Sequence, residues 1–172
     1  MKLTKLDVKD RLILINQYKI LSKLEPTEAN YYKELIEILE NGYEIFYSLL
    51  NQWIDEEMPR DKSRLVLDIL DLYRALEDLK RKTKDERLLK HSYGKFNGFD
   101  GNNESEYLSF TRFLIEVQGK FQEQKQYYYE NDHLNSHCPM LDKYERMLAT
   151  IKEKDIAIWQ MNVEQALSIL DS

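Results

Sequence analysis

Four side chains that can bind a metal ion lie within seven residues of one another: Asp132, His133, His137 and Cys138. The two histidines are four residues apart, which is the spacing at which one helix face presents two imidazoles to zinc. The residues between them show no helical periodicity, and Pro139 follows directly. We therefore interpret this segment as a solvated loop and predict no metal and no cofactor.

Three glycines, Gly94, Gly98 and Gly101, lie close together and suggest a loop that holds a ligand. Their spacing matches neither a dinucleotide-binding nor a P-loop motif, so we expect no phosphate site. Asp100 begins a polar run that resembles the start of a calcium-binding loop. The sixth position of that loop would be Ser105, where the tight turn requires glycine, so the pattern does not favour calcium.

A polar residue within an apolar helix face indicates a second kind of site. Gln17 lies near the middle of such a face, so we expect its amide to be buried and to need hydrogen-bond partners. The amide either bonds a helix end or the long loop, or it lines a small polar pocket. Our tentative ligand pocket consists of Asn16, Gln17, Asp100 and Arg112, with Asp100 as a carboxylate and Arg112 as an anion-binding group. No catalytic motif is recognisable, and we name no catalytic residue.

The segment 31–54 has the outline of a DNA-binding helix-turn-helix, because two short helices meet at Asn41 and Gly42. Its second helix would contain no Arg or Lys to contact phosphates or guanine. The chain has 31 acidic and 25 basic residues, a formal net charge of −6, and no uninterrupted basic stripe. We therefore expect no nucleic-acid partner.

Helical periodicity accounts for most of the chain. The apolar spacing predicts helices over about 7–24, 27–41, 43–54, 59–79, 103–121 and 139–151. Asn103 with Glu106 predicts a capping box at the start of the helix over 103–121, and Asn162 with Gln165 caps a short last helix. Residues 83–103 lose this periodicity, and loops of that length are often functional. The sequence thus predicts an all-α, single-domain bundle of about six or seven helices over 1–172, with one long Gly-rich loop.

Composition supports a globular helical protein. Apolar residues make up 42% and charged residues 33%, and five Gly and three Pro are too few for the turns of a β-sandwich. The single cysteine excludes an internal disulfide and fits a reducing compartment. Met1 to Asp7 contain no apolar signal segment, and no run is long enough to span a bilayer. We expect a cytoplasmic protein without a membrane partner.

The predicted helices carry more apolar surface than one core of this size uses. The helices at 7–24, 59–79 and 103–121 each carry apolar residues outside their main face, such as Leu12 and Ile15 in the first of them. A bundle cannot place all three helices at its centre. We therefore expect a homodimer or higher homo-oligomer, with Leu67 and Leu70 as the positions that would test the interface. The alternative is that the Gly-rich loop and the Tyr-rich segment cover that face.

Several segments resemble the bacterial YfbU family, in that family's order and over almost the whole chain. They are Arg11–Lys19, Gly98–Asp100, Glu106–Leu108 with Arg112–Phe113, and Pro139–Met140 with Lys143–Leu148. The resemblance implies an all-helical, cytoplasmic protein of uncharacterised function, and it implies no enzyme. The His137–Cys138 pair does not belong to this pattern.

Two hypotheses for the function follow. We favour a helical binding or regulatory module that recognises a small molecule or a protein partner. The alternative is an unrecognised enzyme, such as a metal-dependent hydrolase, with its site where the Gly-rich loop meets the first and fifth predicted helices. Metal analysis together with a thermal-shift screen of metabolites distinguishes the two.

Overall fold

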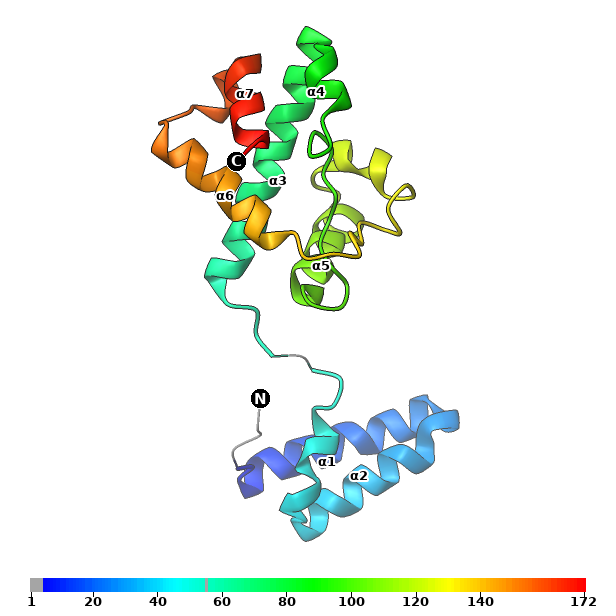
Figure 1. Ribbon diagram of the computed structural model, residues 1–172. Coiled ribbons are helices and arrows are strands. Elements are labelled where there is room, and N and C mark those ends of the chain that lie inside the picture. The colour runs from blue at the N-terminus through cyan, green and yellow to red at the C-terminus, as the bar shows by residue number, and fades with distance from the viewer. Residues whose placement is uncertain (1–4, 55) are drawn as a thin grey trace. The chain divides into compact units, whose positions relative to one another are not determined.

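The computed structural model describes residues 5–54 and 56–172, and these residues form helices joined by loops, with no strand. The expected all-α class is confirmed. Residues 1–4, part of the segment that we expect to lack a signal sequence, lie outside the described residues. The chain divides into two compact units, Met1–Glu57 (unit 1) and Met58–Ser172 (unit 2), each with its own hydrophobic core (Figure 1). A single domain over 1–172 stays a prediction.

Unit 1 is a helical hairpin of α1 (Val8–Leu24) and α2 (Ala29–Asn41), joined through the short 3-10 helix η1 (Pro26–Glu28). The side chain of Asp7 caps the first turn of α1, because its carboxylate accepts a backbone N–H that has no partner within the helix. Gly42 ends α2 in the left-handed conformation, with φ of 68°. Both helix boundaries agree with the sequence-based prediction.

The core of unit 1 shows which face of α1 meets α2. A second 3-10 helix, η2 (Glu44–Leu50), stands where an α-helix over 43–54 was expected, and its Tyr47 is buried. Ile15 is buried, although we expected it outside the main apolar face of its helix, whereas Gln17 is exposed. The expectation of a buried Gln17 amide was wrong, because α1 has apolar residues on two sides and periodicity alone does not choose between them.

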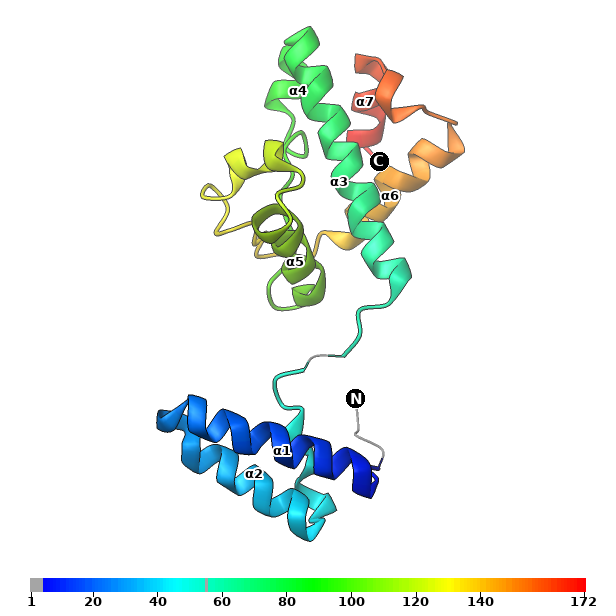
Figure 2. The same cartoon turned by 180° about the vertical axis from the view of Figure 1, so that it is seen from behind.

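Unit 2 is built around α3 (Arg60–Thr83), which contacts α5 (Ser105–Arg112), α6 (Leu141–Glu153) and α7 (Val163–Leu170) (Figure 2). These neighbours cover α3 on several sides, so that Leu70 is fully buried. Leu70, one of the two positions expected at a self-association interface, is therefore part of the core of unit 2, whereas Leu67 is half-buried against it. Self-association of the chain stays a prediction.

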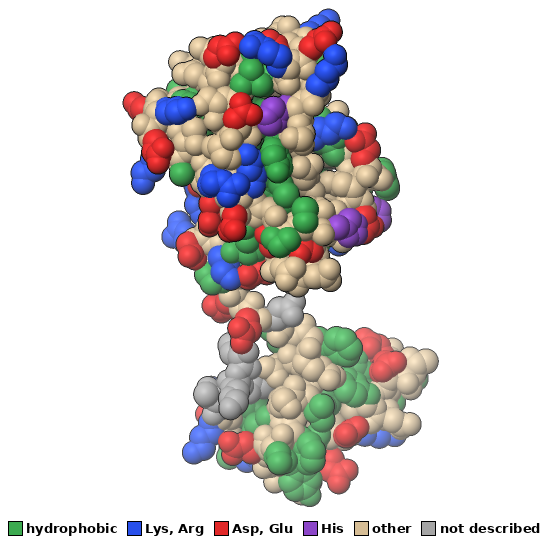
Figure 3. All heavy atoms as spheres, viewed as in Figure 1, with side chains coloured by type: hydrophobic (Ala, Val, Ile, Leu, Met, Phe, Trp, Pro, Cys, Tyr) green, Lys and Arg blue, Asp and Glu red, His purple; other side chains and the backbone are tan. Residues whose placement is uncertain are grey.

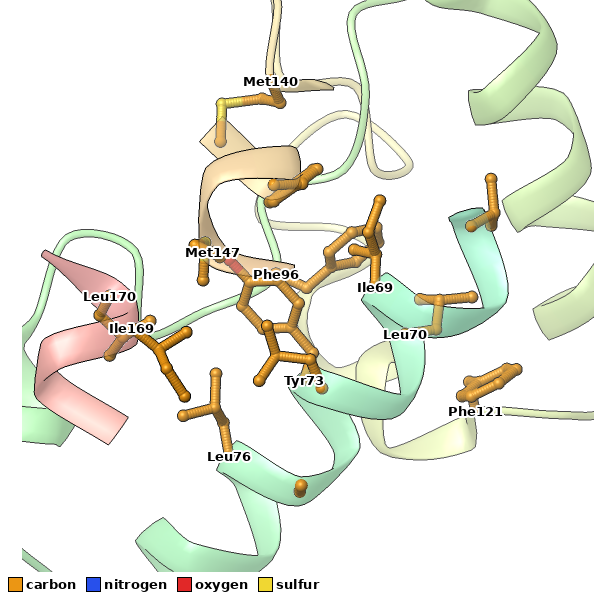
Figure 4. Close-up of a cluster of buried hydrophobic side chains, with 14 of the residues drawn as sticks. Ile69, Leu70, Tyr73, Leu76, Phe96, Phe121, Met140, Met147, Ile169 and Leu170 are labelled. Carbon is orange, nitrogen blue, oxygen red and sulfur yellow. The ribbon is translucent and has the colours of Figure 1, made fainter. Parts of the chain in front are cut away.

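Aromatic side chains dominate the centre of this core. The ring of Phe96 lies 5.2 Å from that of Tyr73 on α3 and 5.8 Å from that of Tyr144 on α6, measured between centroids. Figure 4 shows side chains of α3, α6 and α7 gathered around these rings. Phe96 belongs to the Gly-rich segment, so the long loop contributes to the core instead of lying only on the surface.

The remaining elements of unit 2 are short. They are α4 (Glu86–Lys90), the π-helix η3 (Phe113–Val117), and the 3-10 helices η4 (Gln122–Tyr127) and η5 (Ile158–Gln160). The fifth expected helix thus begins later and changes into a π-helix, and its N-terminus lacks the expected cap by Asn103 and Glu106. None of the described helices combines the length and the apolar character that crossing a bilayer requires.

Candidate functional site

Two irregular segments of unit 2 that carry most of the candidate residues lie side by side. The backbone N–H of Phe99 donates to the carbonyl oxygen of Leu134, and the N–H of Ser136 donates to the carbonyl oxygen of Phe99, both at 3.1 Å. Gly101 N–H donates to Asn135 Oδ1 at 2.9 Å, although these residues are 34 positions apart. We call residues 98–104 together with 131–138 the loop junction.

The junction requires glycine at position 98. Gly98 has φ of 84°, and a Cβ atom there would lie 1.8 Å from the carbonyl oxygen of Leu134. Its own carbonyl oxygen accepts a hydrogen bond from the Tyr144 hydroxyl at 2.9 Å, which ties the loop to α6. The glycines of this loop therefore permit close backbone packing, and this explains their presence without a bound phosphate.

The second segment of the junction contains a left-handed turn made of residues other than glycine. Asp132, His133 and Leu134 have φ of 47°, 57° and 66°. Such a conformation costs roughly 1–2 kcal/mol per residue, so it persists only where surrounding contacts fix it. Asn131 Oδ1 accepts the N–H of Leu134 at 3.0 Å, and Arg112 donates to the carbonyl oxygens of His133 and Asp132 at 2.8 and 3.3 Å.

Two residues of the tentative pocket thus have partners within the chain. The guanidinium of Arg112 holds the left-handed turn. Asp100 is buried, and its carboxylate accepts hydrogen bonds from the side chain of Asn103 and, at 3.1 Å, from the N–H of Asn102. These hydrogen bonds lower the pKa of the Asp100 carboxyl below its usual range. Both side chains therefore bond other groups of the loop junction and hold it together.

Glu104 is a buried carboxylate that sequence reasoning missed. Its Oε1 accepts the N–H groups of Met140 and Leu141 at 2.7 and 2.8 Å, and its Oε2 accepts the N–H of Asp100 at 3.0 Å. It therefore joins the Gly-rich loop to the N-terminus of α6, whose first N–H groups have no intrahelical partner. The sequence offers one hint of this role: none of the residues just before α6 has a side chain suited to cap that helix.

The metal-ligand candidates lie at the surface of the junction. The ring of His133 stacks on Tyr128 at a centroid distance of 4.7 Å, and His137 Nε2 lies 3.5 Å from Asp132 Oδ2. Cys138 is exposed. Figure 3 shows histidine side chains beside acidic ones at one edge of unit 2. Within the part of the chain that the structure describes, no three such side chains converge on one point. A metal-free protein is still a prediction for elemental analysis.

The other two residues of the tentative pocket lie in unit 1. Asn16 and Gln17 are exposed on α1, whereas Asp100 and Arg112 belong to the loop junction. Within neither unit are the four residues brought together. The tentative pocket stays a prediction.

An open groove runs along α3 beside α6 and η5, and we call it the Trp159 groove. It has a volume of about 520 Å³ and an apolar floor formed by Leu72, Leu148, Ile151, Ile156 and Ile158. Its rim carries charges of both signs, from Arg64, Asp68, Asp71 and Lys152. A neighbouring hollow of about 340 Å³ is also lined by Trp159, together with Arg74 and Glu123.

Ion pairs and a cation–π contact hold the charged side chains of the groove and of the neighbouring hollow. Arg64 Nε lies 2.9 Å from Asp68 Oδ1, and Arg74 Nε donates to Glu123 Oε1 at 2.7 Å. The guanidinium of Arg74 also lies 4.2 Å from the ring centroid of Phe121, a cation–π contact. Sequence reasoning did not find this groove, because its residues come from three separate elements and match no motif.

One buried polar side chain near these elements has no hydrogen-bond partner. Gln124 on η4 is fully buried, and neither its Oε1 nor its Nε2 has a partner among the described residues. Because a buried, unpaired amide destabilises the folded state, we expect Gln124→Leu to raise the free energy of unfolding by about 1–3 kcal/mol, measured by urea denaturation. Gln126→Leu is the control, since that exposed amide already donates to the Glu123 carbonyl oxygen at 2.8 Å. A clear loss of stability in Gln124→Leu would show that its amide has a partner.

Comparison with known proteins covers the whole chain. Residues 1–172 match the family model described as the YfbU domain. The chain is 45% identical over 165 residues to UPF0304 protein MJECS11 of Methanocaldococcus jannaschii, and the match covers 95% of this chain and 97% of that relative. The similarity therefore extends through both units, and neither description names a reaction or a ligand.

Proposed function

Because this chain belongs to the YfbU family, whose descriptions name no reaction, we propose that it is a helical binding module with the Trp159 groove as its ligand site. The observation that carries the proposal is an exposed tryptophan at the edge of an apolar-floored groove. Trp159 is 58% exposed, and large apolar side chains left open beside a concave surface are typical of binding sites.

The dimensions and lining of the groove favour a small amphipathic ligand. Its volume of about 520 Å³ falls within the range of small-molecule sites. The apolar floor suits an aliphatic or aromatic body, and the indole of Trp159 offers a flat stacking surface. Lys152 and Asp71 on its rim suit a ligand that carries both an anionic and a cationic group.

The loop junction supports a structural role better than a catalytic one. Asp100, Glu104 and Arg112 direct their polar groups to the backbone or side chains of their own loops. The enzyme hypothesis therefore has no specific observation in its favour. We also propose that the module is cytoplasmic and binds neither nucleic acid nor membrane, because the chain has a net charge of −6 and a single cysteine.

Ligand binding at the groove can be measured through Trp159 itself. The sequence has two tryptophans, so Trp53→Phe leaves Trp159 as the only indole fluorophore. In a screen of small metabolites we expect an amphipathic compound to change the Trp159 emission and to raise the melting temperature. At one hundred times its Kd, a ligand stabilises the native state by about 2.7 kcal/mol, which corresponds to roughly 5–10 °C for a chain of this size.

Two variants make this experiment specific. Trp159→Ala should remove the thermal shift, because the ligand loses its stacking surface. Val117→Ala, which shortens another exposed apolar side chain of unit 2, should retain the shift. An unchanged thermal shift in Trp159→Ala would place the ligand elsewhere and overturn the proposal.

A further inference from the structure

The first helix of unit 1 has an apolar face that α2 does not cover. Ile13, Ile20 and Leu24 are 47%, 59% and 71% exposed, and Gln17 lies among them. Their spacing of four, three and four residues places them in one stripe on the side of α1 opposite Ile15. We call Ile13, Gln17, Ile20 and Leu24 the outer stripe.

Unit 1 has a small core, so covering this face would add to its stability. Its core contains five buried hydrophobic side chains, from α1, α2 and η2. The apolar residues of α2 are already buried or half-buried, so the exposed apolar side chains of unit 1 lie on α1 and in the segment 43–54. Small helical units normally need an additional stabilising element, and association of subunits is a common one.

We propose that the outer stripe packs antiparallel against the outer stripe of a second copy of this chain, with the two-fold axis between Gln17 and Ile20. In this arrangement Ile13 faces Leu24 of the partner subunit, and the apolar ends of the stripe cover one another. Lys9, one turn before Ile13, then lies near the C-terminal end of the partner subunit's helix, where a positive charge is favourable. The opposed helix dipoles also favour the antiparallel pairing.

The distribution of exposed apolar residues favours a second copy as the occupant. Five of them lie on α1 alone, namely Val8, Leu12, Ile13, Ile20 and Leu24. Five others of unit 1 lie in the segment 43–54, outside the two long helices. The five of unit 2 are scattered over four segments: Leu89, Phe113 with Val117, Tyr129 and Trp159. The outer stripe is therefore best covered by the same stripe of a second chain, because an isologous dimer joins the same surface of both subunits.

The available area agrees with a dimer interface at the small end of the usual range. α1 has 17 residues and is therefore about 25 Å long. Its exposed apolar side chains each offer on the order of 100 Å². The three of the outer stripe offer about 300 Å² per partner, and with the neighbouring polar side chains the area is that of a weak dimer interface, below about 600 Å² per partner. Gln17 would be the polar residue that fixes the register of the pair, as a single polar position does in coiled coils.

Light scattering across a dilution series tests this proposal. The unmodified chain should have the mass of a dimer at tens of micromolar, and Ile20→Glu should reduce it to the mass of a monomer with an unchanged helical circular dichroism spectrum. Val117→Glu, an equivalent change on η3 of unit 2, should remain dimeric. A monomeric mass for the unmodified chain, or a dimeric Ile20→Glu protein, would overturn the proposal. Ile20→Glu should leave ligand binding at the Trp159 groove unchanged, so the two proposals fail separately.

Disulfide cross-linking determines the orientation of the helices. In a Cys138→Ser background, Ile20→Cys lies near the two-fold axis and should cross-link to its own copy under oxidation. Ile13→Cys should not do so alone, but it should cross-link when mixed with Leu24→Cys. Cross-linking of Ile13→Cys to itself would contradict the antiparallel arrangement.

Discussion

Gly98→Ala is expected to prevent unit 2 from folding into its observed structure. The added Cβ would lie 1.8 Å from the Leu134 carbonyl oxygen and 2.9 Å from its Cα, and these backbone atoms cannot move away without opening the junction. The junction would then lose the backbone hydrogen bonds between Phe99 and Leu134 and the bond from the Tyr144 hydroxyl. We expect a loss of at least about 4 kcal/mol, measured by urea denaturation followed by circular dichroism.

Gly119→Ala is a matched control for this substitution. Gly119 also has a positive φ, 65°, but a Cβ atom there would have no neighbour within 4 Å. The control therefore measures the cost of the left-handed backbone without the clash, and we expect about 1 kcal/mol. Equal losses in the two variants would show that the contact between Gly98 and Leu134 does not constrain the fold.

Glu104→Gln is expected to lower the free energy of unfolding by about 2–4 kcal/mol. The carboxylate accepts three backbone N–H groups, and an amide of the same shape has only one oxygen. Its NH₂ group would face either the N–H of Asp100 or those of Met140 and Leu141, leaving a buried donor without an acceptor. Urea denaturation gives the loss of stability, and amide hydrogen exchange should show lost protection at one or more of these three N–H groups.

Glu106→Gln provides the comparison, because it makes the same chemical change two residues away at the surface. The Glu106 carboxylate pairs with Lys62, and both side chains are substantially exposed. Exposed ion pairs contribute about 0–1 kcal/mol, so a small effect is expected. If Glu104→Gln destabilises the protein no more than Glu106→Gln, the carboxylate does not hold the Gly-rich loop to α6.

Local signals in the sequence determined the long helices and several of their ends. The start of α1 near Asp7, the end of α2 at Gly42 and the capping box of Asn162 with Gln165 at α7 all agree with expectation. These features depend on contacts between residues three or four positions apart, and such contacts can be read directly from spacing. The all-α class follows from the same local rules.

Tertiary structure alone decided which helix faces are covered and which loops meet. Gln17 is exposed because α2 packs on the side of α1 that contains Ile15, although both sides are apolar enough to pack. Glu104 meets Met140 only because two irregular segments, far apart in sequence, lie together. The physical reason is that periodicity describes one helix at a time, whereas pairing between distant segments depends on shape and hydrogen-bond complementarity that arise only when the chain has folded.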